Sequence, residues 1–328
     1  MTTRVPETLI TTGFSSMYSP KNRIINGDFR VWQRNTSFTD PDGVYTADRW
    51  KADMDIGGTG AGTLSRQAFT VGQTDVPGEP EYHLRYDLTT ALSSNGPILI
   101  QPIEDVRTFA GSTVTVSLYA KVASGTKNIT ARLTQNFGAG GSSAVAMTDL
   151  TAPITTSWQR LSAKVAISSI TGKTLGTDHY LEFSLRDDSV GDTYTLDVAD
   201  VQVELGEHAT AFERVPMQEL MSSCQRYYHR VPASSLAVVG TYNTTEANFM
   251  GFFPTTMRGV PTPTLIDTTP TVDIGGTTVG SSSTITESTI TDANGWRVRV
   301  DGFTGLTAGQ AGFGYGSGSD LIDFDAEL

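Results

Sequence analysis

The sequence predicts an all-β protein, in which antiparallel sheets pack as a β-sandwich. Short segments of alternating apolar and polar residues recur from residue 21 onward, and runs rich in Gly, Ser and Asp separate them. No helical pattern intervenes between the segments of residues 21–212. The chain has 33 Gly and 14 Pro but only 18% charged residues, which suits strands joined by many turns.

The pattern divides the chain into four parts. Residues 1–20 lack periodicity and are interrupted by proline and glycine, so we expect an extended N-terminal attachment arm. Residues 21–212 form the predicted sandwich domain, and residues 213–230 a connector helix. Residues 231–328 return to β patterning, which predicts a second, smaller C-terminal β domain.

Three segments predict strands of the sandwich clearly: YHLRYDL (82–88), TVTVSLYAKV (113–122) and ITARLTQN (129–136). Each places its apolar residues on one face and its polar residues on the other. The turn ASGTKN joins the second segment to the third, so we expect these two strands to pair as a hairpin.

Further strands are predicted at residues 158–167, 180–186 and 194–205. In the last segment the apolar phase slips between Val198 and Ala199. A shift of one residue moves side chains to the opposite face of a sheet, so we predict a β-bulge near Ala199.

The connector helix is predicted from residues 216–228. Pro216 suits the first helical position, and Arg226, His229 and Arg230 are expected in the last turn, where the helix dipole favours cations. The apolar residues form one stripe at helical spacing: Met217, Leu220, Met221, Cys224, Tyr227 and Tyr228.

Strict alternation in WRVRV (296–300) and IDFDAEL (322–328) predicts strands of the C-terminal domain. FMGFF (249–253) adds an apolar run to the helix stripe. Exposed on a monomer, such patches would promote aggregation, so the sequence predicts association between copies of the chain.

Composition argues against several functions. The net charge is −12 and no Lys/Arg cluster stands out, so we expect no binding to nucleic acid. No stretch approaches the ~20 apolar residues that span a bilayer, and the N-terminus lacks the apolar core of a signal peptide. We therefore expect no membrane insertion. The single cysteine, Cys224, excludes an intrachain disulfide and a thiolate zinc cluster.

Enzyme motifs are missing, so we predict no catalytic residues and no cofactor. The chain has no GxSxG, HExxH or P-loop motif, and GTGAGT (58–63) lacks the GxGxxG spacing. Its four histidines form no i, i+4 pair. A glycan-degrading enzyme stays open as an alternative, because a pair of carboxylates can act together from distant positions in the sequence.

Several phrases in order resemble a known family. They are INGDFRVWQR (25–34), YTADRW (45–50), DVQVELGEHATAFERVPMQELMSSCQRYY (200–228), FFPTTMRGVPTPTL (252–265) and DAEL (325–328). Together they resemble the jelly-roll, carbohydrate-binding-like domain of many bacteriophage tail-fibre and other virion appendage proteins. The resemblance runs from about residue 21 to the C-terminus.

This resemblance implies a structural subunit of a virion, assembled in the host cytoplasm. Its partners would be other virion proteins, bound through residues 1–20, and a host-surface glycan. It also suggests a homotrimer, with the helix at residues 216–228 and the C-terminal domain near the three-fold axis. A tail fibre, a tail tip and a purely structural head fibre or decoration protein agree equally with the sequence.

The opening motif is interpreted as mainly architectural. Asn26-Gly27 permits a turn with positive φ that starts the first strand, and Phe29, Val31 and Trp32 enter the core or its margin. Arg34 could meet Asp48 of the ADRW segment. As an alternative, Trp32 and Trp50 could form a sugar-stacking pair.

Related jelly rolls often hold a structural calcium between the first and last strands. Asp28 and Asp200 are the plausible oxygen donors in this chain. Arg30 stands where such domains tend to carry a Glu, and its charge opposes a metal. We therefore predict no metal ligand, while a calcium near these two aspartates stays open.

Three residues are the predicted glycan contacts: Tyr119, Arg132 and Asn136. Tyr119 is the aromatic on the polar face of its strand, and the other two lie on the polar face of its expected hairpin partner. A ring supplies an apolar platform for a sugar, and a guanidinium and an amide supply directional hydrogen bonds. The alternative is a tyrosine that merely covers the hairpin beside solvated neighbours.

Overall fold

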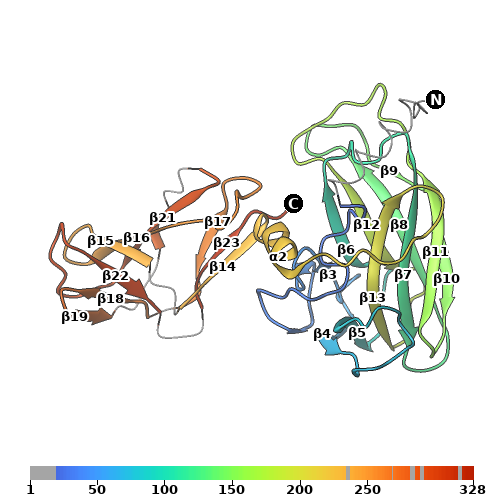
Figure 1. The fold of residues 1–328 in the computed structure, drawn as a ribbon, viewed down its shortest axis with the longest axis horizontal. Helices are drawn as coiled ribbons and strands as arrows, with labels where there is room; N and C mark the ends of the chain where they lie inside the picture. The colour runs from blue at the N-terminus through green and yellow to red at the C-terminus, as the bar shows by residue number, and fades with distance from the viewer. Residues whose placement is uncertain (1–19, 234–236, 268, 281–284, 289–291, 317–319) are drawn as a thin grey trace, which may run out of the picture. The chain divides into compact units, whose positions relative to one another are not determined.

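The computed structural model describes residues 20–233, 237–267, 269–280, 285–288, 292–316 and 320–328 (Figure 1). The predicted arm lies outside these residues except for Pro20. The chain forms two compact units, of which the first ends at Val215 and includes Leu328, and the second runs from Pro216 to Glu327. As predicted, the fold is all-β, and the described residues contain a single helix, α2 (Met217–Gln225).

Six antiparallel strands form sheet 1 of the N-terminal unit, in the spatial order β1-β4-β5-β13-β7-β11. Their bounds are β1 (Ser37–Thr39), β4 (Ala61–Ala68), β5 (Tyr82–Thr90), β13 (Tyr194–Leu205), β7 (Thr113–Val122) and β11 (Gln159–Ala166).

Seven strands form sheet 2, in the order β10-β8-β12-β6-β3-β2, with β9 paired to β8. Their bounds are β10 (Leu150–Ile154), β8 (Lys127–Asn136), β12 (Tyr180–Asp187), β6 (Gly96–Glu104), β3 (Lys51–Ala52), β2 (Val44–Tyr45) and β9 (Val145–Ala146). Strands β5 to β8 lie alternately in sheet 1 and sheet 2, as the two layers in Figure 1 show. The unit is thus the predicted jelly-roll sandwich.

The hairpin predicted from residues 113–122 and 129–136 is wrong. The first segment, β7, pairs with β13 and β11, whereas the second, β8, pairs with β12 and β10. After β7 the chain crosses to the other sheet instead of returning beside itself. Both strands still face the shared core as predicted, because alternation reports the buried face and not the neighbouring strand.

The core of the sandwich fills the space between the inner faces of the two sheets. Trp50 is fully buried, with its ring centroid 5.1 Å from that of Phe29 and 5.9 Å from that of Phe183. Phe29 precedes the strands of both sheets, while Phe183 belongs to β12 of sheet 2. The aromatic residues of the opening motif therefore pack as core, and a sugar-stacking role for Trp50 is excluded by its burial.

Turns, and not a strand, form the opening motif, contrary to the prediction that it starts the first strand. Asn26 has φ of 59°, and its side chain accepts a hydrogen bond from the Val31 N–H at 3.0 Å and donates to the Val31 carbonyl at 2.8 Å. Trp50 donates its indole N–H to the Asn26 carbonyl at 3.0 Å. Side chains therefore form the hydrogen bonds to backbone N–H and C=O groups that a neighbouring strand would otherwise form.

The motif is also held against β13. Val201 donates its N–H to the Gly27 carbonyl at 2.9 Å. A Cβ added to Gly27 would lie 2.1 Å from the Val201 oxygen, so only glycine allows this approach. The predicted bulge is confirmed beside it, since the register of β13 against β7 shifts between Ala199 and Gln202, and Asp200 has φ of 49°.

Helix α2 is shorter than the predicted range of 213–230. Pro216, predicted at the first helical position, is instead the N-cap residue before Met217. At the other end, Tyr228 already begins strand β14, and His229 and Arg230 lie on that strand instead of in the last helical turn. Arg230 pairs with Asp323 at 2.6 and 2.7 Å. Strand pairing thus overrides a helical apolar pattern at this end of the segment.

Two sheets form the C-terminal unit. Sheet 3 has the order β14-β23-β17, and sheet 4 the order β19-β18-β22-β15-β16-β21-β20. Sheet 3 consists of β14 (Tyr228–Pro232), β23 (Asp320–Asp325) and β17 (Thr262–Leu265). Sheet 4 consists of β19 (Thr277–Gly280), β18 (Thr271–Ile274), β22 (Ala311–Tyr315), β15 (Ala237–Thr241), β16 (Glu246–Phe252), β21 (Gly295–Asp301) and β20 (Ile285–Ser288). Phe324 of sheet 3 packs on Trp296 of sheet 4, with ring centroids 5.0 Å apart.

The apolar stripe of the helix is covered within the chain itself. Leu220, Cys224, Tyr227 and Tyr228 are each at most 5% exposed, and only Met217 of the stripe is largely exposed. The helix therefore does not offer the open apolar face on which its predicted role in association depended. Within the described residues, no helix is long and apolar enough to cross a membrane.

Candidate functional site

The three predicted contact residues lie on two different surfaces. Tyr119, on β7, is on the outer face of sheet 1. Arg132 and Asn136, on β8, are on the outer face of sheet 2. The two outer faces point away from each other across the sandwich, so the structure separates the tyrosine from the other two residues. Each residue stays a predicted contact, but the three do not form one site.

On sheet 1, Tyr119 lies opposite Ala199 of β13 and Arg160 of β11. The Arg160 guanidinium is 6.0 Å from the centre of the tyrosine ring. The ring is half-buried, whereas Ala199 beside it is fully buried.

Next to Tyr119 on this face is an aromatic cluster of Phe69, His83 and Trp158. The ring centroids of Phe69 and His83 are 4.7 Å apart, those of Phe69 and Trp158 are 5.2 Å apart, and those of His83 and Trp158 are 5.3 Å apart. Phe69 and Trp158 are half-buried, so part of each ring faces solvent. Lys121 places its ammonium 5.2 Å from the Trp158 ring centre.

Asp197 organises the charges around this cluster. It lies on β13, between Lys121 of β7 and Arg85 of β5. Arg85 donates two hydrogen bonds to its carboxylate, at 2.8 and 2.9 Å, and the Lys121 ammonium is 3.7 Å away. The His83 Nε2 is 3.6 Å from the same carboxylate.

These neighbours keep Asp197 ionised although its side chain is only 5% exposed. Burial alone would raise the pKa, but the interactions with Arg85 and His83 outweigh it and lower the pKa to about 2. The result is a fixed anion within a ring of cations and aromatic edges, on adjacent strands of one sheet.

The outer face of sheet 2 is built differently. Arg132 forms a bidentate pair with Asp149, which raises the pKa of the arginine and lowers that of the aspartate. Asn136 donates its side-chain N–H to the Tyr180 hydroxyl at 3.0 Å. Both predicted residues on this face thus use their polar groups on neighbours within the chain.

Glu182 lies at the centre of sheet 2, opposite Thr134 and Pro102. Burial raises the pKa of this glutamate, although nearby cations oppose the increase. The cations are Arg186, Lys51 and Arg132. Nothing in the sequence marks this carboxylate, because its strand carries an ordinary alternating pattern.

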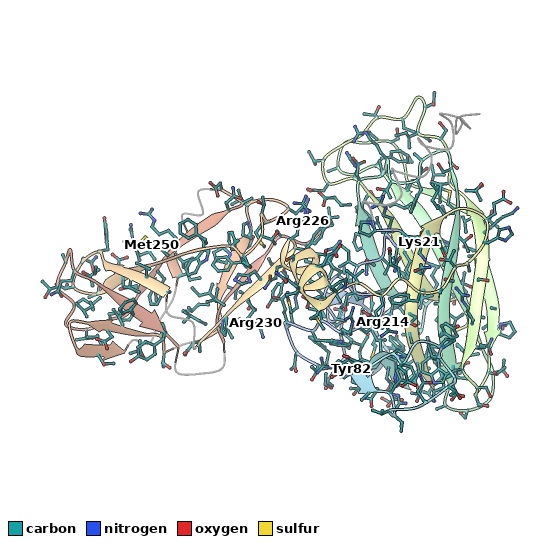
Figure 2. The ribbon with its side chains drawn as sticks, viewed as in Figure 1. Lys21, Tyr82, Arg214, Arg226, Arg230 and Met250 are labelled. Carbon is teal, nitrogen blue, oxygen red and sulfur yellow. The ribbon has the colours of Figure 1, made fainter. Side chains whose placement is uncertain are left out.

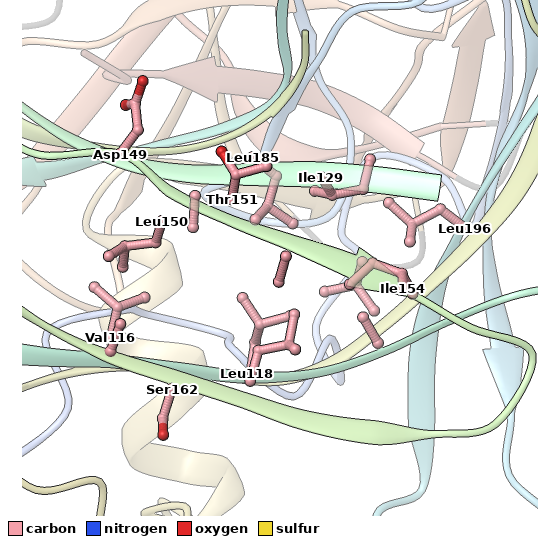
Figure 3. Close-up of a pocket in the computed structure, with 16 residues that line it drawn as sticks. Val116, Leu118, Ile129, Asp149, Leu150, Thr151, Ile154, Ser162, Leu185 and Leu196 are labelled. Carbon is pink, nitrogen blue, oxygen red and sulfur yellow. The ribbon is translucent and has the colours of Figure 1, made fainter. Parts of the chain in front are cut away.

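A cavity of about 330 Å³ lies inside the sandwich, between the edge strands β10 and β11 (Figure 3). Four alanines leave the space that larger core residues fill elsewhere: Ala120, Ala131, Ala152 and Ala163. Figure 3 shows the Asp149 carboxylate and the Ser162 hydroxyl directed away from the apolar side chains. Such a lining suits apolar groups and does not provide the convergent donors that a sugar requires.

Near the opening motif, Asp28 and Asp200 do not fit a calcium site. The Arg30 Nε donates to the Asp28 carboxylate at 2.6 Å, so a fixed cation occupies that oxygen. Burial, together with the negative charge of Asp28, raises the pKa of Asp200 to about 7 against the opposing charge of Arg214. The described residues contain no group of three metal-ligating side chains.

The chain matches no protein-family model, and no curated protein matches it. Several solved structures are similar. A putative sugar-binding protein from Bacteroides thetaiotaomicron is 13% identical with a TM-score of 0.36, over 56% of this chain and 100% of that one. The CBM22-1 xylan-binding domain of Paenibacillus barcinonensis Xyn10C is 14% identical with a TM-score of 0.31, over 53% and 94%.

The C-terminal family 22 carbohydrate-binding module of Clostridium thermocellum Xyn10B is 19% identical with a TM-score of 0.30, over 55% of this chain and 100% of that one. These structures span about half of the chain. At such identities and scores the likeness is one of fold, and it does not identify a ligand.

The aromatic cluster could have been found from the sequence. Trp158 begins the segment WQRLSAKVAI, in which Leu161, Ala163 and Val165 mark the buried phase. Trp158 shares the opposite, outward phase with Arg160. An aromatic residue in the polar phase of a strand was the same signal that selected Tyr119.

Proposed function

We propose that the chain is a structural subunit of a virion appendage, and that its N-terminal sandwich contributes to recognition of a host-surface glycan. The observation that supports glycan binding is the outer face of sheet 1, where Trp158 and Tyr119 stand beside Lys121 and Arg85. Half-buried rings can stack on the C–H face of a sugar, and the Lys121 ammonium can donate to its hydroxyls, whereas Arg85 is held in a bidentate pair with Asp197. All four residues lie on or next to strands, which hold them rigidly.

The separation of the two aromatic positions suits an extended ligand. Trp158 lies next to Lys121, which is two residues from Tyr119 on the same face of β7. Two residues along a strand span about 7 Å. A chain of at least two sugar units could therefore contact both rings.

A binding assay on glycan arrays tests this site. Trp158→Ala should weaken binding about tenfold or more, because a ring at the centre of the contact contributes most of its energy. Arg132→Ala is the matched control on the opposite face, where we expect little change. If only the control variant loses binding, the site lies on sheet 2 and the proposal is wrong.

The virion role rests on the resemblance of the sequence phrases to appendage proteins. Deleting residues 1–20 should leave the sandwich folded but prevent incorporation into particles. Particles that still carry the shortened protein would contradict attachment through this segment.

Homotrimeric assembly is part of the same proposal. Light scattering on the full chain tests it, because trimeric assembly gives the mass of three 35.1 kDa chains or, where trimers associate further, a multiple of that mass. A mass of one chain at micromolar concentration would reject it. Release of reducing ends from a bound glycan would instead favour the alternative of a glycan-degrading enzyme.

A further inference from the structure

The outer face of sheet 4 carries a row of five cross-strand neighbours, here called the ladder: Asp273, Phe313, Val238, Met250 and Arg297. Asp273 of β18 pairs with Phe313 of β22, and Phe313 pairs with Val238 of β15. Val238 pairs with Met250 of β16, and Met250 pairs with Arg297 of β21. Residues that pair directly across antiparallel strands point to the same face of the sheet.

Exposure confirms which face this is. Val238 is 55% exposed and Phe313 is 54% exposed, while the next residues along the strands, Val239, Phe249 and Val298, are fully buried. Met250, labelled in Figure 2, is half-buried. Three apolar side chains therefore form a contiguous row that the described part of the chain leaves partly open to water.

The row next to the ladder is small on one side and polar on the other. Gly240 pairs with Ala311, and neither has a long side chain, whereas on the other side Asn248 pairs with Arg299. Phe252, at the end of β16, is 89% exposed. The apolar part of this face can approach a second sheet closely, and its exposure is unfavourable in water.

The ladder is also ordered by charge. An acidic residue, Asp273, stands at one end and a basic residue, Arg297, at the other, with Val238 in the middle. Rotation by a half-turn about an axis that runs along the strands, in the plane of the contact, reverses the ladder. Asp273 then faces the partner's Arg297, Phe313 faces the partner's Met250, and Val238 faces its own copy.

We propose that this face is a two-fold interface between two copies of the chain. Each position of the ladder meets a chemically matching position, as an isologous contact requires. The opposite orientation, with unreversed ladders, would place like charges together at both ends and is disfavoured. Because the two ends of the ladder carry opposite charges, the face complements a second copy of itself better than an unrelated partner.

This interface is distinct from a three-fold assembly and compatible with it. A two-fold contact produces an even number of chains. Two single chains would form a dimer, and two trimers would form a hexamer. The decisive measurement is therefore the mass of the full chain, compared with that of variants in the ladder.

Val238→Arg is the strongest disrupting variant, because Val238 faces itself and one substitution places two like charges on the axis. We expect the mass to fall by half and association to weaken about 100-fold or more. Val71→Arg is the matched control, since Val71 is 96% exposed in the N-terminal unit. It should leave the mass unchanged.

A charge exchange makes the test specific. Asp273→Arg and Arg297→Asp should each weaken association when made alone, and the double variant should restore it. Thermal melting of each variant reports whether sheet 4 still folds. A wild-type mass of one or three chains, a Val238→Arg mass equal to wild type in a folded protein, or a folded double variant without restoration would overturn the proposal.

Discussion

The two outer faces of the N-terminal sandwich are made from the same alternating strands but differ in chemistry. On sheet 1, Trp158 and Tyr119 lie beside charged side chains that surround one buried carboxylate, Asp197. On sheet 2, Arg132 is paired with Asp149, and Asn136 is bonded to Tyr180. The first face presents aromatic surface together with charge, whereas the second satisfies its polar groups internally.

A polar surface is therefore not by itself a binding surface. A ligand hydroxyl that approached Arg132 would compete with a bidentate carboxylate, which makes little net gain. A sugar above Trp158 would instead cover apolar surface that is open to water. Sheet 2 also has a half-buried ring, Tyr180, so sheet 1 is distinguished by a group of neighbouring rings, Phe69, His83 and Trp158, and not by the number of polar groups.

The largest effect is expected within sheet 1, at Asp200 in the bulge of β13. Its folded-state pKa of about 7 is higher than its ordinary value, so its contribution favours folding below about pH 4 and is lost as the pH rises through 7. Asp200→Asn keeps the neutral form at every pH. We expect this variant to be more stable than wild type at pH 8 by up to about 4 kcal/mol, and equally stable near pH 4.

Urea denaturation at both pH values measures this difference. A variant that is less stable than wild type at pH 8 would show that the ion pair with Arg214, at 4.0 Å, outweighs the cost of burial.

Substitution of Asp197 allows a direct comparison of the two faces. Asp197→Ala removes the shared counter-charge of Arg85 and Lys121, and should lower the free energy of unfolding by about 3 kcal/mol at pH 7. On sheet 2, Asp149→Ala breaks a more exposed pair and should cost about 1 kcal/mol or less. Equal losses would contradict the distinction between the faces.

The stability difference between wild type and Asp197→Ala should also depend on pH. The pKa of Asp197 is lowered to about 2, so its contribution is complete above about pH 4 and is lost as the pH falls through 2. The stability difference between wild type and Asp197→Ala should therefore shrink only at strongly acidic pH. A difference that already disappears at pH 5 would mean that another group controls it.

Tyr119→Ala should weaken adsorption to host cells by about 1 kcal/mol, with little change in melting temperature, because the ring is at the surface. Asn136→Ala is the comparison on sheet 2: a site on sheet 1 requires that it leave adsorption unchanged, whereas a loss would support the contact that the sequence predicts at Asn136. Unchanged adsorption for Tyr119→Ala would restrict the contact to the aromatic cluster.

The smallest effect concerns the cavity, to which both sheets contribute. Ala131→Val adds two methyl groups from β8 and should raise the free energy of unfolding by about 0.5 to 1 kcal/mol. Calorimetry measures the gain. A loss of stability would show that the edge strands β10 and β11 close over the cavity and leave no room for the added atoms.

The sequence alone determined the fold class, because alternation marks the buried face of each strand and glycine-rich turns mark its ends. It also determined the bulge near Ala199 and the core role of Phe29, since both follow from residue order along one strand or turn. The outward position of Tyr119 followed from the same local pattern.

Which strands lie side by side depends on the tertiary packing and could not be predicted from the sequence. The sequence of β7 and β8 is compatible with a hairpin, but their partners are chosen by packing of whole sheets, so Tyr119 and Arg132 came to lie on opposite faces. Likewise, Tyr228 continues a helical stripe in the sequence, yet its pairing with Asp325 of β23 draws it into a strand. An alternating pattern shows which face of a strand is buried, and an apolar stripe shows which side of a helix is buried. Neither pattern identifies the neighbouring element, because pairing depends on contacts between residues far apart in the chain.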